Sequence, residues 1–245
     1  MSRIAIVSAM HEELSALLPL LQGARIERRA GRECHLGELD GRAVVLVLCG
    51  IGKVAAATTA AVLLDGMQVH TLLLTGVAGG LGPGVRVGDV VIAHTLLQHD
   101  MDASPLFPRY EVPLTGRSRF AADPAVCAAL TAGCRHVLQA PHTGLARLGI
   151  ARPQLHAGLV ISGDRFIATA AESAALRAAL PDALAVEMEG AAVAQVCADF
   201  NRPFAVLRTV SDRADDSAHV DFARFIDEVA AEFSRDIVRA TLPRL

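Results

Sequence analysis

Short apolar runs rich in β-branched residues alternate along the chain with longer stretches rich in alanine and leucine. We expect strands over Arg3–Ser8, Ala43–Cys49, Thr71–Thr75, Asp89–His94, Leu159–Ser162, Ala183–Val186 and Phe204–Val210. Helices are expected over Glu12–Leu21, Lys53–Leu64, Pro124–Ala132, Thr169–Ala179, Gly190–Asp199 and Phe222–Leu242. Because helices that connect parallel strands cover both faces of a sheet, the pattern predicts a three-layer α/β/α fold around a mainly parallel, mixed and twisted sheet.

The composition agrees with a buried sheet and argues against other classes of protein. Hydrophobic residues make up 52% of the 245 residues, but apolar runs such as 43–48 fall short of the roughly 18 residues that a membrane helix needs. The net charge of -3 and the scattered basic residues argue against a nucleic-acid partner. The chain shows no signal-peptide layout and its five cysteines form no metal-binding pairs. We therefore expect one cytoplasmic domain over residues 1–245, with no membrane partner.

Two glycine-rich segments each follow a predicted strand. They are Gly50-Ile-Gly-Lys53 and Thr75-Gly-Val-Ala-Gly-Gly80, and we expect turns over Gly50–Gly52 and Gly76–Gly80. Neither matches a Walker A loop or the dinucleotide-binding fingerprint. Ligands of open α/β sheets bind at the carboxyl edge of the strands, so two such turns at one edge indicate a small-molecule site.

Carboxylates follow three of the predicted strands. They are Glu13, the pair Glu187 and Glu189, and Asp212. Taken singly, each is explained as well by a helix cap or by the helix dipole. Glu187 and Glu189 are two positions apart, so they cannot share one helix face. Other acidic groups, at 212–216 and 99–102, lack metal-binding spacing, and we expect neither a metal nor a cofactor.

The segment Gln98–Ser118 departs from the regular alternation. It contains three prolines, Phe107 and the only tyrosine, Tyr110. Long proline-rich connections are often functional loops or subunit contacts, although an ordinary surface loop explains the composition equally well.

The motifs, taken in their order, resemble those of the methylthioadenosine/S-adenosylhomocysteine nucleosidases, within the purine nucleoside phosphorylase superfamily. The resemblance spans nearly the whole chain from Ile4 and implies a nucleoside phosphorylase-like fold. It rests on Ser8-Ala-Met-His-Glu-Glu13, Gly50-Ile-Gly-Lys53, Thr75-Gly-Val-Ala-Gly-Gly80, Gly88-Asp-Val-Val91, Ser162-Gly-Asp164, Val186-Glu-Met-Glu-Gly190 and Ser211-Asp212.

This resemblance implies hydrolysis of a purine nucleoside within methionine salvage. 5′-Methylthioadenosine is the expected substrate, and S-adenosylhomocysteine or 5′-deoxyadenosine are expected as further ones. Glu13 is the implied base on the attacking water, Glu189 the carboxylate on the ribose hydroxyls, and Asp212 the acid at purine N7. The implied substrate-binding residues are Met10, Ile51, Val77, Ala78, Gly79, Phe166, Ile167, Glu187, Met188, Arg208, Ser211 and Phe222. Phe107, Tyr110 and Pro113 fall where this family reaches into a neighbouring subunit's site, which implies a homodimer.

Water is favoured over phosphate as the nucleophile. The related phosphorylases bind phosphate through arginines before the second glycine turn and in the first loop. Here the corresponding positions hold Leu74 and the arginine-free stretch Ser8–Glu13, and a dianion without such partners is costly to bind. Val77 stands where the best-known nucleosidases have serine, and Arg165 where a small residue is usual.

Three alternatives stay open at this stage. A purine nucleoside phosphorylase or a futalosine-type nucleosidase would have the same fold. A nucleoside-binding protein without catalysis would need no base for water, so the complete set of Glu13, Glu189 and Asp212 argues against it. A flavodoxin-like redox protein would need a phosphate-binding loop rich in serine and threonine, which the sequence lacks.

Overall fold

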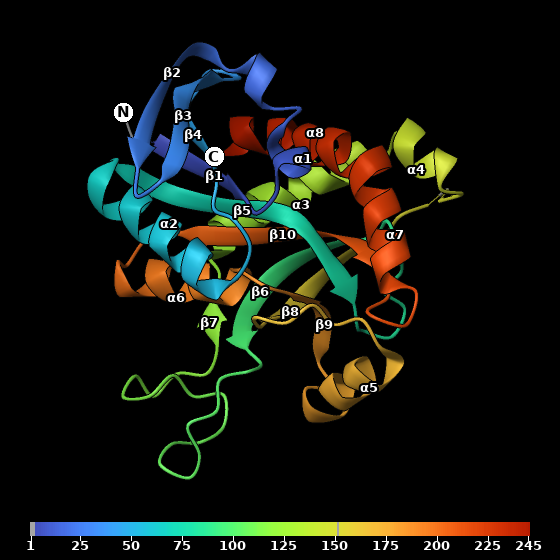
Figure 1. Cartoon of the computed structure of the whole chain (residues 1–245). Helices are drawn as coiled ribbons and strands as arrows, with labels where there is room; N and C mark the ends of the chain where they lie inside the picture. The colour runs from blue at the N-terminus through green and yellow to red at the C-terminus, as the bar shows by residue number, and fades with distance from the viewer. Residues whose placement is uncertain (1–2, 151) are drawn as a thin grey trace.

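A ten-stranded mixed sheet forms the centre of the molecule, which the computed structural model describes over residues 3–150 and 152–245 (Figure 1). The strands are β1 (Arg3–Ser8), β2 (Gln22–Arg29), β3 (Arg32–Leu39), β4 (Arg42–Leu48), β5 (Val69–Gly80), β6 (Val90–Gln98), β7 (Phe120–Ala121), β8 (Leu155–Ser162), β9 (Ala183–Glu187) and β10 (Phe204–Asp212). The helices are α1 (His11–Leu14), α2 (Lys53–Gly66), α3 (Pro124–Leu138), α4 (Thr143–Arg147), α5 (Ala170–Ala179), α6 (Gly190–Asp199), α7 (Ala218–Phe225) and α8 (Ala231–Thr241).

The sheet has an open half and a closed half. Strands β2, β3, β4, β1 and β5 follow one another in that order, and β1 pairs in parallel with both β4 and β5. Strand β5 then pairs with β9 and with β10, and the series β9, β8, β6, β10 returns to β5 and closes a ring. The mixed sheet with its helices confirms the predicted fold class; the ring was not predicted.

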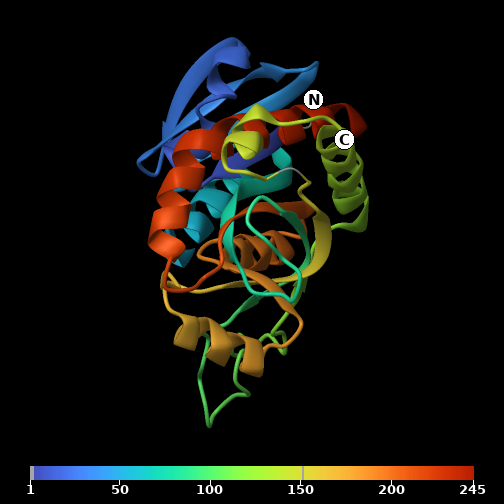
Figure 2. The same ribbon diagram turned by 90° about the vertical axis from the view of Figure 1, so that its right-hand side faces the viewer.

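Helices cover both sides of this sheet. Helices α2 and α6 pack against each other on one side, whereas α3 and α8 pack together with α1 on the other (Figures 1 and 2). The core between these layers contains fully buried side chains such as Ile6, Leu46, Phe225 and Phe233. No helix within the described ranges combines the length and the apolar character that crossing a membrane requires.

The predicted helix Glu12–Leu21 is wrong in extent. Helix α1 ends at Leu14, and a separate 3-10 turn covers Leu18–Leu20. Pro19 lies within that turn and has no N–H to donate to the preceding turn of an α-helix, which explains the break. Leu14 and Leu17 are buried as their spacing predicts.

The predicted turn Gly76–Gly80 is also wrong, because β5 continues through it. Gly76 to Gly79 pair with β10, and Gly79 and Gly80 also pair with β9. These two neighbours supply the backbone partners that keep a glycine-rich segment extended. The other predicted strands and helices are present, several with longer bounds.

Two hairpins at the open end of the sheet were missed by the sequence analysis. Ala30-Gly31 joins β2 to β3, and Asp40-Gly41 joins β3 to β4, with positive φ at all four residues. An Asp-Gly pair between two runs of alternating polarity is a strong signal for such a turn. That signal was present in the sequence.

The C-terminal helix begins earlier than predicted. Helix α7 starts at Ala218 and runs through a π-helical turn, Ile226–Ala230, into α8. Phe225 and Phe233 point into the core, whereas Phe222, which the resemblance implies to bind substrate, lies on the face of α7 that borders a cavity. The segment predicted as a long loop connects β6 to β7 and projects from the body in both views (Figures 1 and 2).

Candidate active site

A cavity of about 470 Å³ opens where β1, β5, β9 and β10 end. Parallel strands such as β1, β5 and β10 end at the same edge of a sheet, so the residues that follow them converge there. The lining residues are Ala9, Met10, Glu13, Ile51, Val77, Ala78, Gly79, Phe166, Val186, Glu187, Met188, Glu189, Ser211, Asp212, His219 and Phe222. The structure therefore brings all four carboxylates singled out in the sequence to one cavity.

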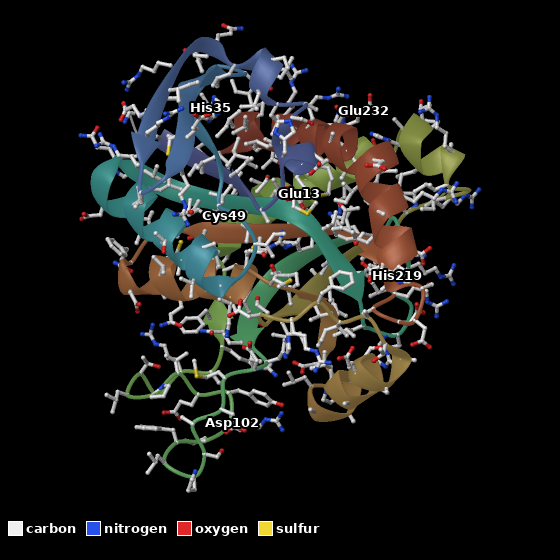
Figure 3. All side chains as sticks on the ribbon, viewed as in Figure 1. Glu13, His35, Cys49, Asp102, His219 and Glu232 are labelled. Atoms are coloured by element: carbon white, nitrogen blue, oxygen red, sulfur yellow. The ribbon has the colours of Figure 1, made fainter. Side chains whose placement is uncertain are left out.

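Glu13 reaches the cavity from the short helix α1, near the middle of the molecule (Figure 3). Its Oε2 accepts hydrogen bonds from the backbone N–H groups of Ala9 and Met10, both at 3.0 Å, and its Oε1 accepts one from Val77 at 3.1 Å. Burial raises the pKa of Glu13, against the opposing effects of Arg208 and these hydrogen bonds. The side chain is thus fixed in place and suited to accept a proton.

Arg208 on β10 lies fully buried beneath the cavity and links two of its carboxylates. Its Nη2 donates to Glu187 and, at 3.3 Å, to Glu189 Oε2. Burial opposes its charge, but Glu187, Glu189 and Glu13 outweigh burial and raise the pKa of Arg208. The guanidinium therefore stays charged and compensates the negative charge around it.

Glu187 and Glu189 have different surroundings, as their spacing predicts. Glu187 accepts hydrogen bonds from Ser162 Oγ and from the backbone N–H groups of Glu189 and Gly190. Glu189 Oε1 accepts one from the backbone N–H of Gly52, at 2.9 Å. The Glu187 carboxylate thus accepts several hydrogen bonds from the protein, whereas the Glu189 carboxylate accepts fewer and faces the cavity.

The pKa of Glu189 is raised to about 7 by burial and by the neighbouring charge of Glu187, against the effects of Arg208 and the Gly52 hydrogen bond. A carboxylate that titrates near neutrality in a cavity is a frequent property of functional sites.

Asp212 ends β10, the strand that lies between β5 and β6. Its Oδ2 accepts a hydrogen bond from Ser211 Oγ and its Oδ1 one from the backbone N–H of Ala214, both at 2.8 Å. Burial raises the pKa of Asp212 despite these hydrogen bonds, and Asp221 and Asp215 raise it further. A raised pKa means that this carboxyl group holds its proton to a higher pH than an exposed aspartate does.

Glycines in β5 leave the space that two of these carboxylates occupy. A Cβ atom at Gly76 would lie 2.7 Å from Glu13 Oε1 and closer still to Arg208, and one at Gly79 would lie 3.0 Å from Asp212 Oδ1. Real Cβ atoms essentially never show the contacts at Gly76, which are shorter than 3.0 Å, and the contact at Gly79 would be tighter than nine in ten real ones. The glycines thus allow close approach within a strand rather than forming the turn that the sequence predicted.

Aromatic rings border the open side of the cavity. Phe166 and Phe222 meet edge to face, with ring centroids 5.7 Å apart. Each ring adds apolar surface to the cavity, on which a planar ligand can pack. Ile167 lies beside this cavity, in a small adjoining pocket that also contains Arg165. Arg165 itself forms an ion pair with Glu172 and is largely exposed.

Three lining residues were missed in the sequence: Ala9, Val186 and His219. Ala9 and Val186 adjoin recognised motifs, and they contribute apolar surface. His219 precedes Phe222 by three positions on α7, and residues at this spacing share a helix face. The i, i+3 relation to Phe222 was the signal available for His219 (Figure 3).

The three residues predicted for a neighbouring subunit do not line the cavity of their own chain. Phe107, Tyr110 and Pro113 lie in the projecting loop, which also carries Asp102 (Figure 3). Leu106 and Leu114 in the same loop are 84% and 89% exposed. The loop thus offers apolar side chains away from its own site, and its role stays a prediction.

Carboxylates predominate among the ionisable side chains that line the cavity. Glu13, Glu187, Glu189 and Asp212 line it, and no arginine or lysine of the described ranges is among its lining residues. The nearby Arg208 is already paired with two carboxylates. A phosphate dianion would therefore meet like charge and no arginine or lysine among the described lining residues. In those same ranges, no group of three or more histidine, cysteine, aspartate or glutamate side chains is placed to hold a metal ion.

Comparison with known proteins identifies the family. A model of the phosphorylase superfamily matches residues 3–243. The 5′-methylthioadenosine/S-adenosylhomocysteine nucleosidase of Neisseria meningitidis, solved with methylthio-immucillin-A, is 33% identical with a TM-score of 0.88, and the match covers all of both chains. This chain is a member of that nucleosidase family.

Other nucleosidases show the same likeness. The Streptococcus pneumoniae nucleosidase, solved with 8-aminoadenine, is 35% identical with a TM-score of 0.87 and full coverage of both chains. The Colwellia psychrerythraea 34H nucleosidase, solved with adenine, is 33% identical with a TM-score of 0.87, and the match covers 100% of this chain and 96% of that one. The family predicted from the sequence motifs is thus confirmed; the roles of individual residues stay predictions.

The raised pKa of Glu189 predicts a pH-dependent stability. Since the folded pKa of about 7 exceeds the ordinary value of 4.5, this group's contribution is full below pH 4.5 and is lost as the pH rises through about 7. The side chain in the Glu189→Gln variant cannot ionise. As the pH rises through this range, the free energy of unfolding of the variant should therefore increase relative to that of the wild type by more than about 1 kcal/mol, because one pKa unit corresponds to about 1.4 kcal/mol. Urea denaturation at both ends of the range measures the gain, and a constant difference would contradict it.

Proposed function

We propose that this nucleosidase hydrolyses the N-glycosidic bond of 5′-methylthioadenosine and S-adenosylhomocysteine, and also of 5′-deoxyadenosine, releasing adenine and the corresponding sugar. The observation that carries the proposal is the convergence of Glu13, Glu189 and Asp212 on one cavity without an exposed cation for phosphate among the described lining residues. The relatives solved with adenine or nucleoside analogues support the substrate class.

Asp212 is the proposed acid. Breaking the C1′–N9 bond moves its electron pair onto the purine, and adenine leaves more readily when N7 receives a proton. Burial favours protonated Asp212, and Ser211 Oγ and the Ala214 N–H fix its orientation. Phe166 and Phe222 offer apolar ring surface to the base. These features support proton transfer from Asp212 to N7 as the bond breaks.

Glu189 is the proposed partner of the ribose hydroxyls. The sugar develops positive charge as the base leaves, and a nearby carboxylate stabilises that charge. Arg208 lies behind Glu189 and limits the rise of its pKa, so that the carboxylate is available in its charged form near neutral pH.

Glu13 is the proposed base. Its Oε1 has one backbone hydrogen bond and can accept another from water, since a carboxylate oxygen has two lone pairs. Water attacks C1′, Glu13 takes one of its protons, and the hydroxyl remains on the sugar. Val77 contributes its N–H to Glu13 but no side-chain hydroxyl, so Glu13 is the group we expect to orient this water.

The apolar residues Met10, Ile51 and Phe222 are proposed to receive the 5′-substituent. Ile51 is 60% exposed, so this part of the cavity is open to solvent in the single chain. A methylthio group is small and apolar and suits such a surface. A futalosine-type substrate has a bulkier acidic 5′-group, for which the described lining offers no positive side chain.

We further propose that the protein is a homodimer that acts in cytoplasmic methionine salvage. The exposed Leu106 and Leu114, and the place of Phe107 between β6 and β7, support a subunit contact. The five cysteines are free and buried, as is usual in a reducing compartment.

Replacing the proposed acid tests the reaction. Asp212→Asn keeps the size of the side chain but cannot donate a carboxyl proton, so adenine release from 5′-methylthioadenosine should fall by more than about a hundredfold. Adenine release is followed by liquid chromatography, and circular dichroism and thermal denaturation check the fold. A folded variant with activity near that of the wild type would exclude Asp212 as the acid.

Mixed dimers test the contribution of the projecting loop. Phe107→Ala and Glu13→Gln each should lower adenine release. In a mixed dimer, one site combines an intact Glu13 with the partner's intact loop, so co-expression should restore about a quarter of wild-type activity for random pairing in a twofold dimer. No recovery in purified mixed dimers, or a monomer in sedimentation experiments, would contradict the shared site.

A further inference from the structure

Lys53 is the only lysine among the 23 basic residues of the chain. It follows the glycine turn between β4 and α2, and the reaction proposed above gives it no role. Lysine and arginine differ in geometry, because an ammonium group is a compact point charge and a guanidinium is a planar fork. A chain that uses arginine at every other basic position therefore raises the question of what this lysine contacts.

The Lys53 side chain joins two residues at the base of the projecting loop. Its Nζ donates to Asp100 Oδ1 at 2.6 Å and to Gln98 Oε1 at 3.1 Å. The side chain of Lys53 is only 16% exposed, so the pair is partly shielded from water. An ion pair of this kind is held more firmly than one on an open surface.

Three hydrogen bonds among Lys53, Asp100 and Asp164 form a closed ring, which we call the Lys53 ring. Besides the ammonium bond to Asp100 Oδ1, the backbone N–H of Asp164 donates to Asp100 Oδ2 at 2.9 Å, and the backbone N–H of Lys53 donates to Asp164 Oδ1 at 2.7 Å. The ring therefore ties together the start of α2, the base of the projecting loop and the segment after β8.

The Lys53 ring lies next to the hydrogen bond that holds Glu189. Gly52 N donates to Glu189 Oε1, and Lys53 N, the next amide along the chain, donates to Asp164. Gly52 has a φ of +95°, and a Cβ atom there would lie 3.1 Å from Asp164 Oδ1. Asp164 thus packs directly against the glycine whose N–H binds Glu189.

We propose that Asp164, fixed by Lys53 and Asp100, is a positioning residue that holds the Gly52 N–H on Glu189. The turn around Gly52 contains two glycines with positive φ, Gly50 and Gly52, and such turns need outside contacts to adopt one conformation. Asp164 supplies that contact from another segment. The consequence for the reaction rests on the proposed role of Glu189 at the ribose.

The Gly52 hydrogen bond has a defined effect on the charge of Glu189. Glu187 from β9 and Glu13 from α1 disfavour the ionised form, Arg208 from β10 favours it, and the buried thiol of Cys49 lies close by. The Gly52 N–H favours the ionised form together with Arg208. Loss of its alignment should leave Glu189 protonated to a higher pH.

Selective labelling gives a direct readout, because a [15N]lysine-labelled sample has a single lysine backbone amide, that of Lys53. Its NMR signal should titrate with the ionisation of Glu189, with a midpoint near pH 7, and this titration should vanish in Glu189→Gln. In Asp164→Ala the amide proton should lose the shift that its hydrogen bond to a carboxylate causes. If neither the chemical shift of this signal nor its pH titration changes in Asp164→Ala and Glu189→Gln, the proposal is overturned, whether or not the protein is an active nucleosidase.

Kinetics with three variants test the consequence for the site. Asp164→Ala should lower kcat/KM for 5′-methylthioadenosine about tenfold at neutral pH, the scale of one lost hydrogen bond to a charged group. The acidic limb of its pH profile should move to higher pH, so that activity recovers at alkaline pH. Asp164→Asn keeps an oxygen for the Lys53 N–H and should stay close to the wild type.

Asp182→Ala is the matched control, since Asp182 forms an ion pair with Arg119 at 2.6 Å outside the cavity. It should leave both the rate and the pH profile unchanged. An Asp164→Ala enzyme with the wild-type pH profile, or one indistinguishable from Asp182→Ala, would overturn the positioning role. A wild-type protein that releases no adenine would instead contradict the proposed function, and the amide titration would still decide the role of Asp164.

Discussion

The buried Arg208 guanidinium sets the charge balance on which the cavity depends. Glu187 and Glu189 both contact it, and Glu13 is close enough to influence its pKa. Several carboxylates cannot ionise together in a buried space without a compensating charge. Because Arg208 sits in the fully buried strand β10, its position is determined by the pairing of β10 with β5 and β6.

The closed half of the sheet brings these carboxylates together at one cavity. Strand β5 pairs with β9 and β10 at once, and its glycines leave room for Glu13 on one side and Asp212 on the other. Glu13 lies within reach of the Arg208 charge, whereas Asp212 is influenced by the acids Asp215 and Asp221. Burial raises the pKa of both carboxyl groups, but the charges around them differ, and this difference supports the proposed roles of Glu13 as base and Asp212 as acid.

The sequence predicted the fold class and the family because these depend on patterns that are local. Alternating strands and helices follow from residue periodicity, and the motifs stand at strand ends in a fixed order. The motifs also identified thirteen of the sixteen cavity-lining residues, all but Ala9, Val186 and His219. Glu13 and Asp212 could be assigned to one site because each follows a strand of the same sheet.

The features that the sequence analysis missed depend on contacts between distant segments. The strand character of Gly76–Gly80 requires β9 and β10 as neighbours, and glycine alone gives no sign of them. Lys53, Asp100 and Asp164 lie about 50 to 110 positions apart, so no spacing rule brings them together. Local signals were also overlooked, at Pro19, which breaks a helix, at the turn Asp40-Gly41, and at His219, three positions before Phe222.

The nucleophile is the central claim, and the mass of the sugar product tests it most directly. The purified protein is incubated with 5′-methylthioadenosine in a buffer with abundant inorganic phosphate, and the products are separated and weighed by mass spectrometry. The carboxylate-rich lining, which includes no arginine or lysine of the described residues, predicts adenine and free methylthioribose, at a rate that phosphate does not increase. Methylthioribose 1-phosphate as the product would contradict the account.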